Sequence, residues 1–512
     1  MRTFSVLPLV LLVACSSSAT SDFLGGGSHA DTASGSYDAD SDTDTDADAD
    51  TDYGDQADTG RPSSDSGDTD TDTEGTPCEE EEPVRLYISP DDSNSMGSAV
   101  LGRNAVLEGW GSAPQAPIRV HEIFNYYEWD YPAAELESLR VTPSLEKQVD
   151  GTWILQLGIS SPPLGNDNRQ PMNLVFSLDT SGSMAGGPME DLKDTMRAIA
   201  GSLRYGDLVS VVDWSETPSV SLRAHPVSGA DDATLLATVD ALTSNGGTNL
   251  EGGLERAYEL AEANYSDNRI NRVVLISDGG ANIGVTSEEV IGRYAGSEFR
   301  AGVYLAGVGV GTGRTYNDDL MDEVTDLGKG ASTFVDNATE AWRVFGESRF
   351  VEQMDVAARN VRVTLDLPPG FSIGRSSAEE YSTDPTQIEP QNIAPSDSVV
   401  IFNRLDTCAP EQVSGESTVG VTLNWQDPAT LQERSMEQSW TFAELLAADG
   451  ARIAKGKALY TYGQALAAWQ SGRRSETEWA VDLALVTLEA AEQQNPGDDA
   501  LEEVRLVLEV LD

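Results

Sequence analysis

Residues 173–184 read Asn173-Leu-Val-Phe-Ser-Leu-Asp-Thr-Ser-Gly-Ser-Met184, an apolar run that ends in an acidic residue and two serines. Continuous apolar runs of this length are typical of a strand buried on both faces, as in a parallel sheet covered by helices. Pro188 and the apolar residues that recur at helical spacing after it indicate a helix. We therefore expect Asp179, Ser181 and Ser183 on the loop at the carboxyl end of the strand, where open α/β sheets place their ligand sites.

Two further oxygen donors follow buried-strand or helix-start patterns downstream. Thr248 lies in Asn245-Gly-Gly-Thr-Asn-Leu250, just before a helix-like run. Asp278 ends the apolar run of Arg272-Val-Val-Leu-Ile-Ser-Asp-Gly-Gly280. Carboxylate and hydroxyl oxygens suit Mg²⁺, which takes about six oxygens at about 2.0–2.1 Å and keeps some of them as water.

The pattern Asp-x-Ser-x-Ser at 179–183, with Thr248 and Asp278 after it, resembles the metal-ion-dependent adhesion site of von Willebrand factor type A domains. All five positions carry the family's residue types. The resemblance implies that Asp179, Ser181, Ser183 and Thr248 offer oxygens to Mg²⁺ or Mn²⁺, and that Asp278 acts through a water. It also implies a protein partner whose carboxylate completes the coordination. The alternative is a domain of this fold whose site binds no metal.

Strand and helix patterns alternate from about residue 171 to 350, which predicts a doubly wound parallel sheet. Further strands are expected at 208–214, 273–276, 303–308 and 332–335, and further helices at 231–242, 250–263, 287–299, 318–327 and 339–347. The glycine-rich stretch 307–313 permits a dinucleotide-binding interpretation, but no acidic residue follows at the required distance after a strand. That signal is weak.

The segments that flank this domain read mainly as strands, at 85–89, 139–145, 153–159, 361–367, 398–402, 419–425 and 436–442. They predict a β-sandwich into which the α/β domain is inserted. The tail is helical: Ser475-x-x-Glu478 is typical of a capping box, with Trp479, Leu483, Val486 and Ala490 on one face, and a last helix runs from 499 to 511.

The first fifteen residues form a short apolar leader that is too short to act as a membrane-spanning stop-transfer helix. Leu12-Val-Ala-Cys15 resembles a bacterial lipobox, which implies that Cys15 is lipidated and anchors the chain to a membrane. Ser16 stands where that family usually carries Asp for inner-membrane retention, so the resemblance favours the outer membrane of a bacterial cell envelope. The alternative is an ordinary secretory peptide with an incidental cysteine.

Residues 16–83 alternate Asp with small polar residues and contain almost nothing apolar, so we expect a disordered tether. The tether carries much of the net charge of −54. Such an acidic chain excludes nucleic acid as a partner. Its regular aspartates lack the Gly and the distal Glu of a calcium loop, so only weak counter-ion binding is expected.

The composition changes predict six parts. These are a lipoprotein signal peptide at 1–15, an acidic linker at 16–83, an accessory segment at 84–170, the type A domain at 171–350, a β-rich accessory segment at 351–442 and a helical region at 443–512. From residue 84 onward the arrangement resembles bacterial lipoproteins in which a type A domain lies between accessory segments.

Three other features allow two interpretations each. Cys78 and Cys408 are an even pair once Cys15 carries lipid, so they form either a disulfide or two free thiols. The aromatic residues Tyr126, Tyr127, Trp129 and Tyr131 form either a sugar platform or, more often, core. His121 is expected to be a packed histidine rather than a ligand.

Catalysis has little support in the sequence. The chain has three histidines and no His-Glu-x-x-His motif, and Ser181 and Ser183 have no evident histidine base. We therefore expect a non-enzymatic binding protein with no catalytic residue. The alternatives are a structural envelope component with a silent metal site and, with less support, a metal-dependent enzyme.

Overall fold

The computed structural model describes residues 83–512 apart from gaps at 90–94, 110–116, 280–302, 313–315 and 347–348. Cys15, Cys78, the acidic linker up to residue 82 and the helix expected at 287–299 lie outside the described residues. Within the part that the structure describes, no helix is both long enough and apolar enough to cross a membrane.

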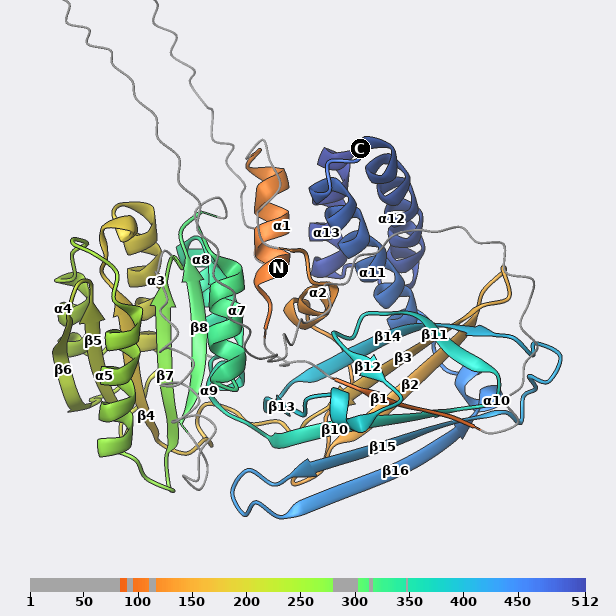
Figure 1. The fold of residues 1–512 in the computed structure, drawn as a ribbon, viewed down its shortest axis with the longest axis horizontal. Helices are drawn as coiled ribbons and strands as arrows, with labels where there is room; N and C mark the ends of the chain where they lie inside the picture. Colours follow the sequence, from red (N-terminus) through yellow and green to blue (C-terminus); the bar gives the residue numbers. More distant parts are fainter. Residues whose placement is uncertain (1–82, 90–94, 110–116, 280–302, 313–315, 347–348) are drawn as a thin grey trace, which may run out of the picture. The chain divides into compact units, whose positions relative to one another are not determined.

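A six-stranded sheet forms the centre of an α/β domain (Figure 1). Its strands are β4 (Met172–Asp179), β5 (Leu208–Trp214), β6 (Pro218–Pro226), β7 (Ile270–Ser277), β8 (Tyr304–Val310) and β9 (Ser332–Val335), arranged β6-β5-β4-β7-β8-β9. Every residue of β4 and β7 is buried, which requires cover on both faces. The predicted doubly wound sheet is therefore confirmed.

The edge strand β6 is a difference from the prediction, because it runs antiparallel to β5. Its residues are half-buried or exposed throughout, so it lacks the continuous apolar run by which the other strands were recognised.

Four helices of the α/β domain agree closely with their expected ranges, whereas the first was expected after Pro188 without bounds and the short last one was not predicted. The described helices of this domain are α3 (Gly187–Ser202), α4 (Ala233–Asp240), α5 (Leu250–Ala263), α7 (Asp318–Leu327), α8 (Ala338–Phe345) and the short α9 (Phe350–Met354). Polar side chains cap the amino ends of two of these helices. Asn249 accepts a hydrogen bond from the Gly252 amide at the start of α5, and Asp232 caps α4.

The flanking strands form two antiparallel sheets that share one hydrophobic core, and we call this part the sandwich. One sheet contains β12 (Tyr381–Ser382), β1 (Val84–Ile88), β10 (Ala358–Leu367), β15 (Thr418–Gln426) and β16 (Glu433–Thr441), with β13 (Gln391–Ile393) paired to β10. The other contains β11 (Phe371–Ser376), β14 (Ser398–Thr407), β3 (Trp153–Ser160) and β2 (Arg140–Lys147).

Strands from before and after the α/β domain are direct neighbours in both sheets of the sandwich. Val84 of β1 pairs with Leu367 of β10, and Ser160 of β3 pairs with Ser398 of β14. The α/β domain is thus an insertion in the sandwich, as predicted.

Among the described residues, six α-helices lie outside the α/β domain, and Figure 1 labels each of them. They are α1 (Gly97–Leu107), α2 (Val120–Tyr126), α10 (Phe442–Leu446), α11 (Ala451–Gln470), α12 (Arg474–Gln494) and α13 (Asp499–Leu511). The helical region predicted at 443–512 includes α11 but gave no bounds for it, because α11 buries residues around much of its circumference and lacks a single apolar stripe.

Two predictions for α12 were wrong. The helix already begins at Arg474, and no side-chain cap precedes it, so Ser475 lies inside the helix rather than at a capping box. Trp479 and Val486 are 65% and 67% exposed, and the buried face instead carries mostly small residues. These are Ala480, Val481, Ala484, Leu488 and Ala491. Small side chains let α11 and α12 approach closely, whereas the prediction gave the inward face to the largest residues.

The aromatic residues after α2 belong to the core. Tyr126, Tyr127 and Tyr131 are buried in the same hydrophobic cluster as the α/β domain, and the Trp129 indole donates to the Phe124 carbonyl at 2.8 Å. His121 is half-buried. A sugar platform needs exposed rings, so the core interpretation holds.

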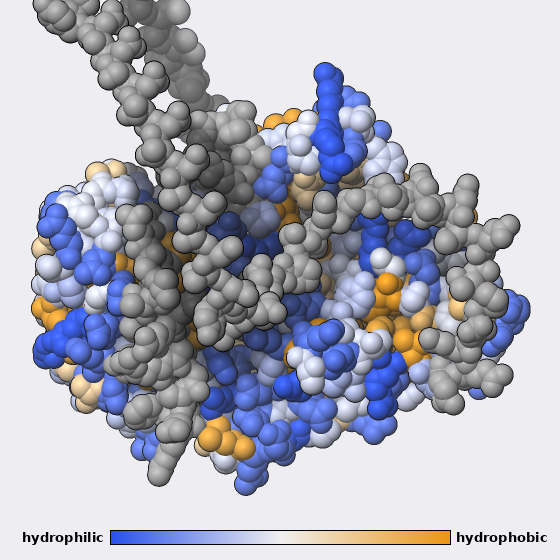
Figure 2. Space-filling model, in the orientation of Figure 1, coloured by the Kyte–Doolittle hydropathy of each residue, from blue (hydrophilic) through white to orange (hydrophobic). Residues whose placement is uncertain are grey.

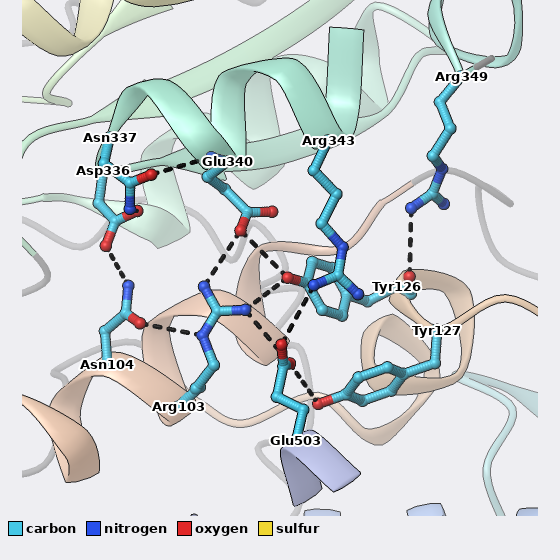
Figure 3. A network of polar contacts seen from close by, with 10 residues as sticks. All are labelled: Arg103, Asn104, Tyr126, Tyr127, Asp336, Asn337, Glu340, Arg343, Arg349 and Glu503. Atoms are coloured by element: carbon cyan, nitrogen blue, oxygen red, sulfur yellow. Dashed lines mark hydrogen bonds and ion pairs between the residues drawn. The ribbon is translucent and has the colours of Figure 1, made fainter. Parts of the chain in front are cut away.

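A buried arginine joins four helices that are distant in sequence (Figure 3). The Arg103 guanidinium on α1 donates to Tyr126 on α2 at 2.6 Å, to Glu340 on α8 at 3.1 Å and to Glu503 on α13 at 3.2 Å. Arg343 on α8 also donates to Glu503, at 3.2 Å. This Arg103 network fastens the α/β domain to the terminal helices.

The surface in Figure 2 is mostly hydrophilic where it is coloured, with hydrophobic residues in small separate patches. On that face, the described residues therefore offer no broad apolar surface for a partner.

Candidate metal site

The candidate site lies at the carboxyl edge of the parallel sheet. Asp179 is the last residue of β4, and Asp278 directly follows β7. Because β4 and β7 are parallel neighbours, their ends bring the two carboxylates to the same edge. Ser181 and Ser183 lie on the turn that leads from β4 through a short 3₁₀ helix, Gly182–Met184, toward α3.

Asp179 is fully buried and is held by two neutral donors. Its Oδ1 accepts a hydrogen bond from the Ser181 amide at 2.8 Å, and its Oδ2 accepts one from the Ser277 hydroxyl at 2.7 Å. No ion pair among the described residues reaches this carboxylate. Asp179 is thus a buried acid with a fixed orientation and no cationic side chain to neutralise it.

The serines connect Asp179 to the second carboxylate. The Ser181 and Ser183 hydroxyl oxygens lie 3.0 Å apart, and the Ser183 hydroxyl donates to Asp278 Oδ1 at 3.2 Å. Four of the five residues singled out from the sequence are therefore connected by hydrogen bonds, from Asp179 through Ser181 and Ser183 to Asp278.

Thr248 is the fifth residue, and only its loop reaches the others. The Gly182 amide donates to the Gly246 carbonyl at 3.2 Å, and the Asn245 amide donates to the Thr180 carbonyl at 2.8 Å. Among the described residues the Thr248 hydroxyl makes no hydrogen bond to the other four, although it is half-buried and two residues from Gly246. The structure brings its segment to the edge but leaves its side chain outside the hydrogen-bonded chain.

The electrostatics of the site favour a cation. Burial raises the pKa of the Asp179 carboxyl, the hydrogen bonds from Ser277 and Ser181 oppose that rise, and the nearby Asp278 adds to it. A buried carboxylate beside another carboxylate is costly to ionise unless positive charge lies close to it.

The donor set fits a hard divalent cation. Two carboxylates and three hydroxyls offer only oxygen, which Mg²⁺ and Mn²⁺ prefer over softer metals. Among the described residues, no group of three or more His, Cys, Asp or Glu side chains is placed to hold a metal. The candidate site differs from such groups because most of its donors are hydroxyls.

Two supporting residues were not predicted. Ser277 orients Asp179, and its position next to Asp278 in the sequence was the available signal. Gly279 has a φ of +70°, and a Cβ there would lie 2.7 Å from the Asn317 carbonyl oxygen. Because the Asn317 amide donates to the Asp278 carbonyl at 3.3 Å, the glycine permits the turn that positions Asp278.

A cavity of about 400 Å³ adjoins the turn after β4. Its lining includes Thr180, Asp213, Ser215 and Asn245, so it is polar and reaches the loop that leads to Thr248.

The remaining sequence predictions fall elsewhere. Cys408 is exposed after β14 and takes part in a disulfide, but Cys78 lies outside the described residues, so the pairing stays a prediction. Gly307 and Gly309 lie within β8 rather than in a phosphate-binding loop. A Cβ at Gly309 would meet the Tyr316 ring at 2.3 Å, so close packing explains this glycine.

Comparison with known proteins identifies the class of domain. Residues 174–281 match the family model described as von Willebrand factor type A domain. The chain contains a von Willebrand factor type A domain.

Relatives extend the similarity beyond the matched range. The uncharacterised protein YfbK of Escherichia coli is 27% identical over 286 residues, which cover 54% of this chain and 49% of YfbK. Human inter-alpha-trypsin inhibitor heavy chain H2 is 25% identical over 266 residues, covering 50% of this chain and 26% of that protein. The chain therefore spans about half the length of YfbK in the match and about a quarter of the heavy chain.

Among solved structures, a von Willebrand factor type A protein from Catenulispora acidiphila is similar, with a TM-score of 0.46 and 14% identity. The match covers 72% of this chain and 88% of that one.

Proposed function

We propose that the chain binds a protein partner through a divalent cation, Mg²⁺ or Mn²⁺, at the carboxyl edge of its sheet. The type A domain supports a general role in protein interaction. The observation that carries the finer proposal is Asp179, a fully buried carboxylate without a cationic partner among the described residues, linked through Ser181 and Ser183 to Asp278.

The cation would be held by Asp179, Ser181, Ser183 and Thr248, with Asp278 acting through water. Two carboxylates neutralise a doubly charged ion, and the hydroxyls add no charge. A position left to water is open to a Glu or Asp of the partner, whose charge interacts strongly with the ion in a partly dry edge. We assign the chain no catalytic residue.

We also propose that the chain is held in the bacterial envelope by lipid on Cys15, most simply at the outer membrane. The support is the sequence of the first sixteen residues alone. Replacing Cys15 by Ala is expected to move the protein from the membrane to the soluble fraction of the cell envelope. Unchanged membrane association in that variant contradicts the anchor but leaves the metal proposal intact.

Calorimetric titration of Mg²⁺ and Mn²⁺ into the full-length chain tests the metal site. The Asp179→Asn variant keeps the shape of the side chain and removes its charge, so its saturable binding heat should be lost. Asp482→Asn, an exposed acid on α12, is the matched control and should bind as wild type does. The acidic linker is present in all three proteins, so its weak ion binding cancels in the comparison. Equal heats in wild type and Asp179→Asn contradict the site.

Partner binding has a separate test. The full-length chain immobilised from envelope extract, with and without EDTA, should retain a protein that EDTA releases and that Asp179→Asn fails to retain. A protein retained equally by wild type and Asp179→Asn, and resistant to EDTA, binds elsewhere and contradicts recognition through the metal.

A further inference from the structure

The opposite end of the parallel sheet carries a cavity rich in arginine. The cavity measures about 800 Å³ and lies where the amino ends of β7 and β8 meet the start of β10 and the hairpin between β15 and β16. Figure 1 shows that hairpin reaching toward the amino ends of β4 and β7. The lining residues used below are Arg269, Arg272, Tyr304, Asp355 and Arg359.

Two guanidinium groups lie against one buried ring in this cavity. Arg272 of β7 and Arg359 of β10 have their guanidinium carbons 4.8 Å and 5.3 Å from the centre of the Tyr304 ring. Tyr304 is 4% exposed and lies beside Arg272 in the register of β7 and β8. The α/β domain and the sandwich each contribute one arginine to the same aromatic surface.

The Arg359 guanidinium keeps donors that the surrounding chain does not use. Arg359 Nε and Nη1 are buried and have no hydrogen-bond acceptor among the described residues. Arg272 is 7% exposed, and its Nη1 donates to the Asn271 carbonyl at 3.2 Å. Burial lowers the pKa of the Arg272 guanidinium, Asp355 and Tyr304 oppose that fall, and the nearby Arg359 adds to it. Unused donors on buried cations are costly unless an acceptor fills the space between them.

The charges around the cavity leave an excess of positive charge. Arg169 is satisfied by Asp207, whose two oxygens lie 2.8 Å and 2.6 Å from its Nη atoms. Arg269 Nη1 donates to the carbonyls of Met172 and Gly206, which carry no charge. The lining carboxylates Asp355 and Asp267 then face three guanidinium groups, those of residues 269, 272 and 359. An excess of cations is notable in a chain with a net charge of −54.

In another charged cavity, both lining cations are paired with carboxylates of the same cavity. That cavity is lined by Glu128, Arg343, Lys455, Asp498 and Glu503 among others. Lys455 pairs with Asp498 at 2.7 Å, and Arg343 pairs with Glu503 at 3.2 Å. It offers no comparable set of unused cationic donors among the described residues.

We propose that the arginine cavity binds a small oxyanion of the phosphate or sulfate kind, held between Arg272 and Arg359. Guanidinium groups match such anions with paired N–H donors in a fixed plane. A tetrahedral oxyanion offers several oxygens in different directions, so it can accept from two forks that belong to different domains. The bound anion links β7 of the α/β domain to β10 of the sandwich.

Calorimetric titration of inorganic phosphate into the full-length chain tests the site, with ionic strength held constant by NaCl and EDTA present to remove divalent ions. Wild type should bind with saturable heat, and Arg359→Gln should weaken binding at least about tenfold, as expected for one charge-assisted hydrogen bond. Arg359→Lys keeps the positive charge but loses the paired N–H donors of the guanidinium, so its phosphate affinity should lie between those of wild type and Arg359→Gln. Arg474→Gln, whose side chain is 92% exposed, is the matched control and should bind as wild type does.

A parallel titration with sulfate identifies the preferred anion, and saturable binding of either anion that depends on Arg359 supports the proposal. Absence of saturable heat for both anions up to about 10 mM, the range of very weak binding, overturns it. Equal affinity in wild type, Arg359→Gln and Arg359→Lys also overturns it. Circular dichroism of each variant confirms that a loss of binding is not a loss of folding. Because EDTA is present throughout, the result is independent of the proposed metal site.

Discussion

Two buried aspartates lie at opposite ends of the same parallel sheet. Asp179 ends β4 at the carboxyl edge, and Asp207 directly precedes β5 at the amino edge. They are 0% and 1% exposed, so burial alone does not distinguish them.

Asp207 and Asp179 differ in the groups that donate hydrogen bonds to them. Asp207 accepts two bonds from the Arg169 guanidinium and one each from the amides of Met172 and Arg204, at 2.6–2.9 Å. Asp179 accepts from two neutral donors and lies near another carboxylate. The partners of Asp207 neutralise it in a buried ion pair. The partners of Asp179 leave its negative charge without a cationic side chain. A buried acid therefore indicates a ligand only when its own chain fails to balance it.

The largest expected effect is at Asp207. Changing Asp207 to Ala leaves the fully buried Arg169 guanidinium without its counter-ion, so the free energy of unfolding should fall by about 3–5 kcal/mol. Chemical denaturation measures the loss, with Asp482→Asn as a surface control. A loss below about 1 kcal/mol, the range of surface ion pairs, contradicts the structural role of this pair.

The next largest effect is at Asp179, where substitution should stabilise the metal-free chain, whereas substitution of Asp207 should destabilise it. Because burial raises the pKa of the Asp179 carboxyl, Asp179→Asn should increase the free energy of unfolding of the metal-free chain. Wild type should gain about 2.7 kcal/mol at Mg²⁺ about 100-fold above its Kd, and Asp179→Asn should gain none. Denaturation curves with EDTA and with Mg²⁺ give both values. The same Mg²⁺ gain in both proteins means that the ion binds elsewhere.

A third carboxylate extends the comparison to pH. Burial raises the pKa of Asp336 to about 6, with Glu340 and Glu108 adding to the rise and Arg103 opposing it. The folded chain therefore holds a proton that the unfolded chain releases near pH 4, so the free energy of unfolding should fall as pH rises from about 4 to about 6. Asp336→Asn should remove about 1–2 kcal/mol of this fall, after allowance for solvent screening.

Denaturation of wild type and Asp336→Asn at pH 4, 5, 6 and 7 gives the two slopes. Parallel slopes in the two proteins show that Asp336 does not titrate in this range.

The smallest effect concerns Ser183, which is exposed and bridges Ser181 and Asp278. Ser183→Ala removes one neutral oxygen from the proposed ion, so Mg²⁺ affinity should fall about tenfold, or about 1.4 kcal/mol. Folding should be unaffected because the residue lies beyond the buried strand. A loss as complete as that of Asp179→Asn shows that the serine positions the whole turn.

The sequence predicted best those elements whose apolar spacing directly marks the residues that are buried in the fold. The expected ranges for α5 and α7 agree with the structure because apolar spacing marks the buried stripe of each helix, and a polar cap also marks the start of α5. Asp179 and Asp278 were placed correctly because a buried strand must end where its apolar run stops. Helix ranges and strand ends can each be recognised from a few neighbouring residues of the sequence.

The rest depended on contacts between distant residues. Neither β6 nor α11 carries a simple apolar pattern, because β6 is half-buried at an edge and α11 is surrounded by neighbours. Arg359 meets Tyr304 and Arg272 only after the sandwich has packed against the α/β domain. No spacing rule connects those three positions, so the arginine cavity had no sequence signal.

The insertion of the α/β domain in the sandwich also affects the order in which the two fold during synthesis. Arg85 and Asp366, which pair across β1 and β10, are 281 residues apart in the chain. A ribosome that adds about 5–20 residues per second needs roughly 15–60 s to cover that distance. Throughout this interval β1 has been made but its neighbour has not, whereas β2 and β3 can already form their hairpin. We expect the α/β domain to fold during synthesis and the sandwich to close last, so its early strands are the part of the nascent chain that most needs protection from premature pairing.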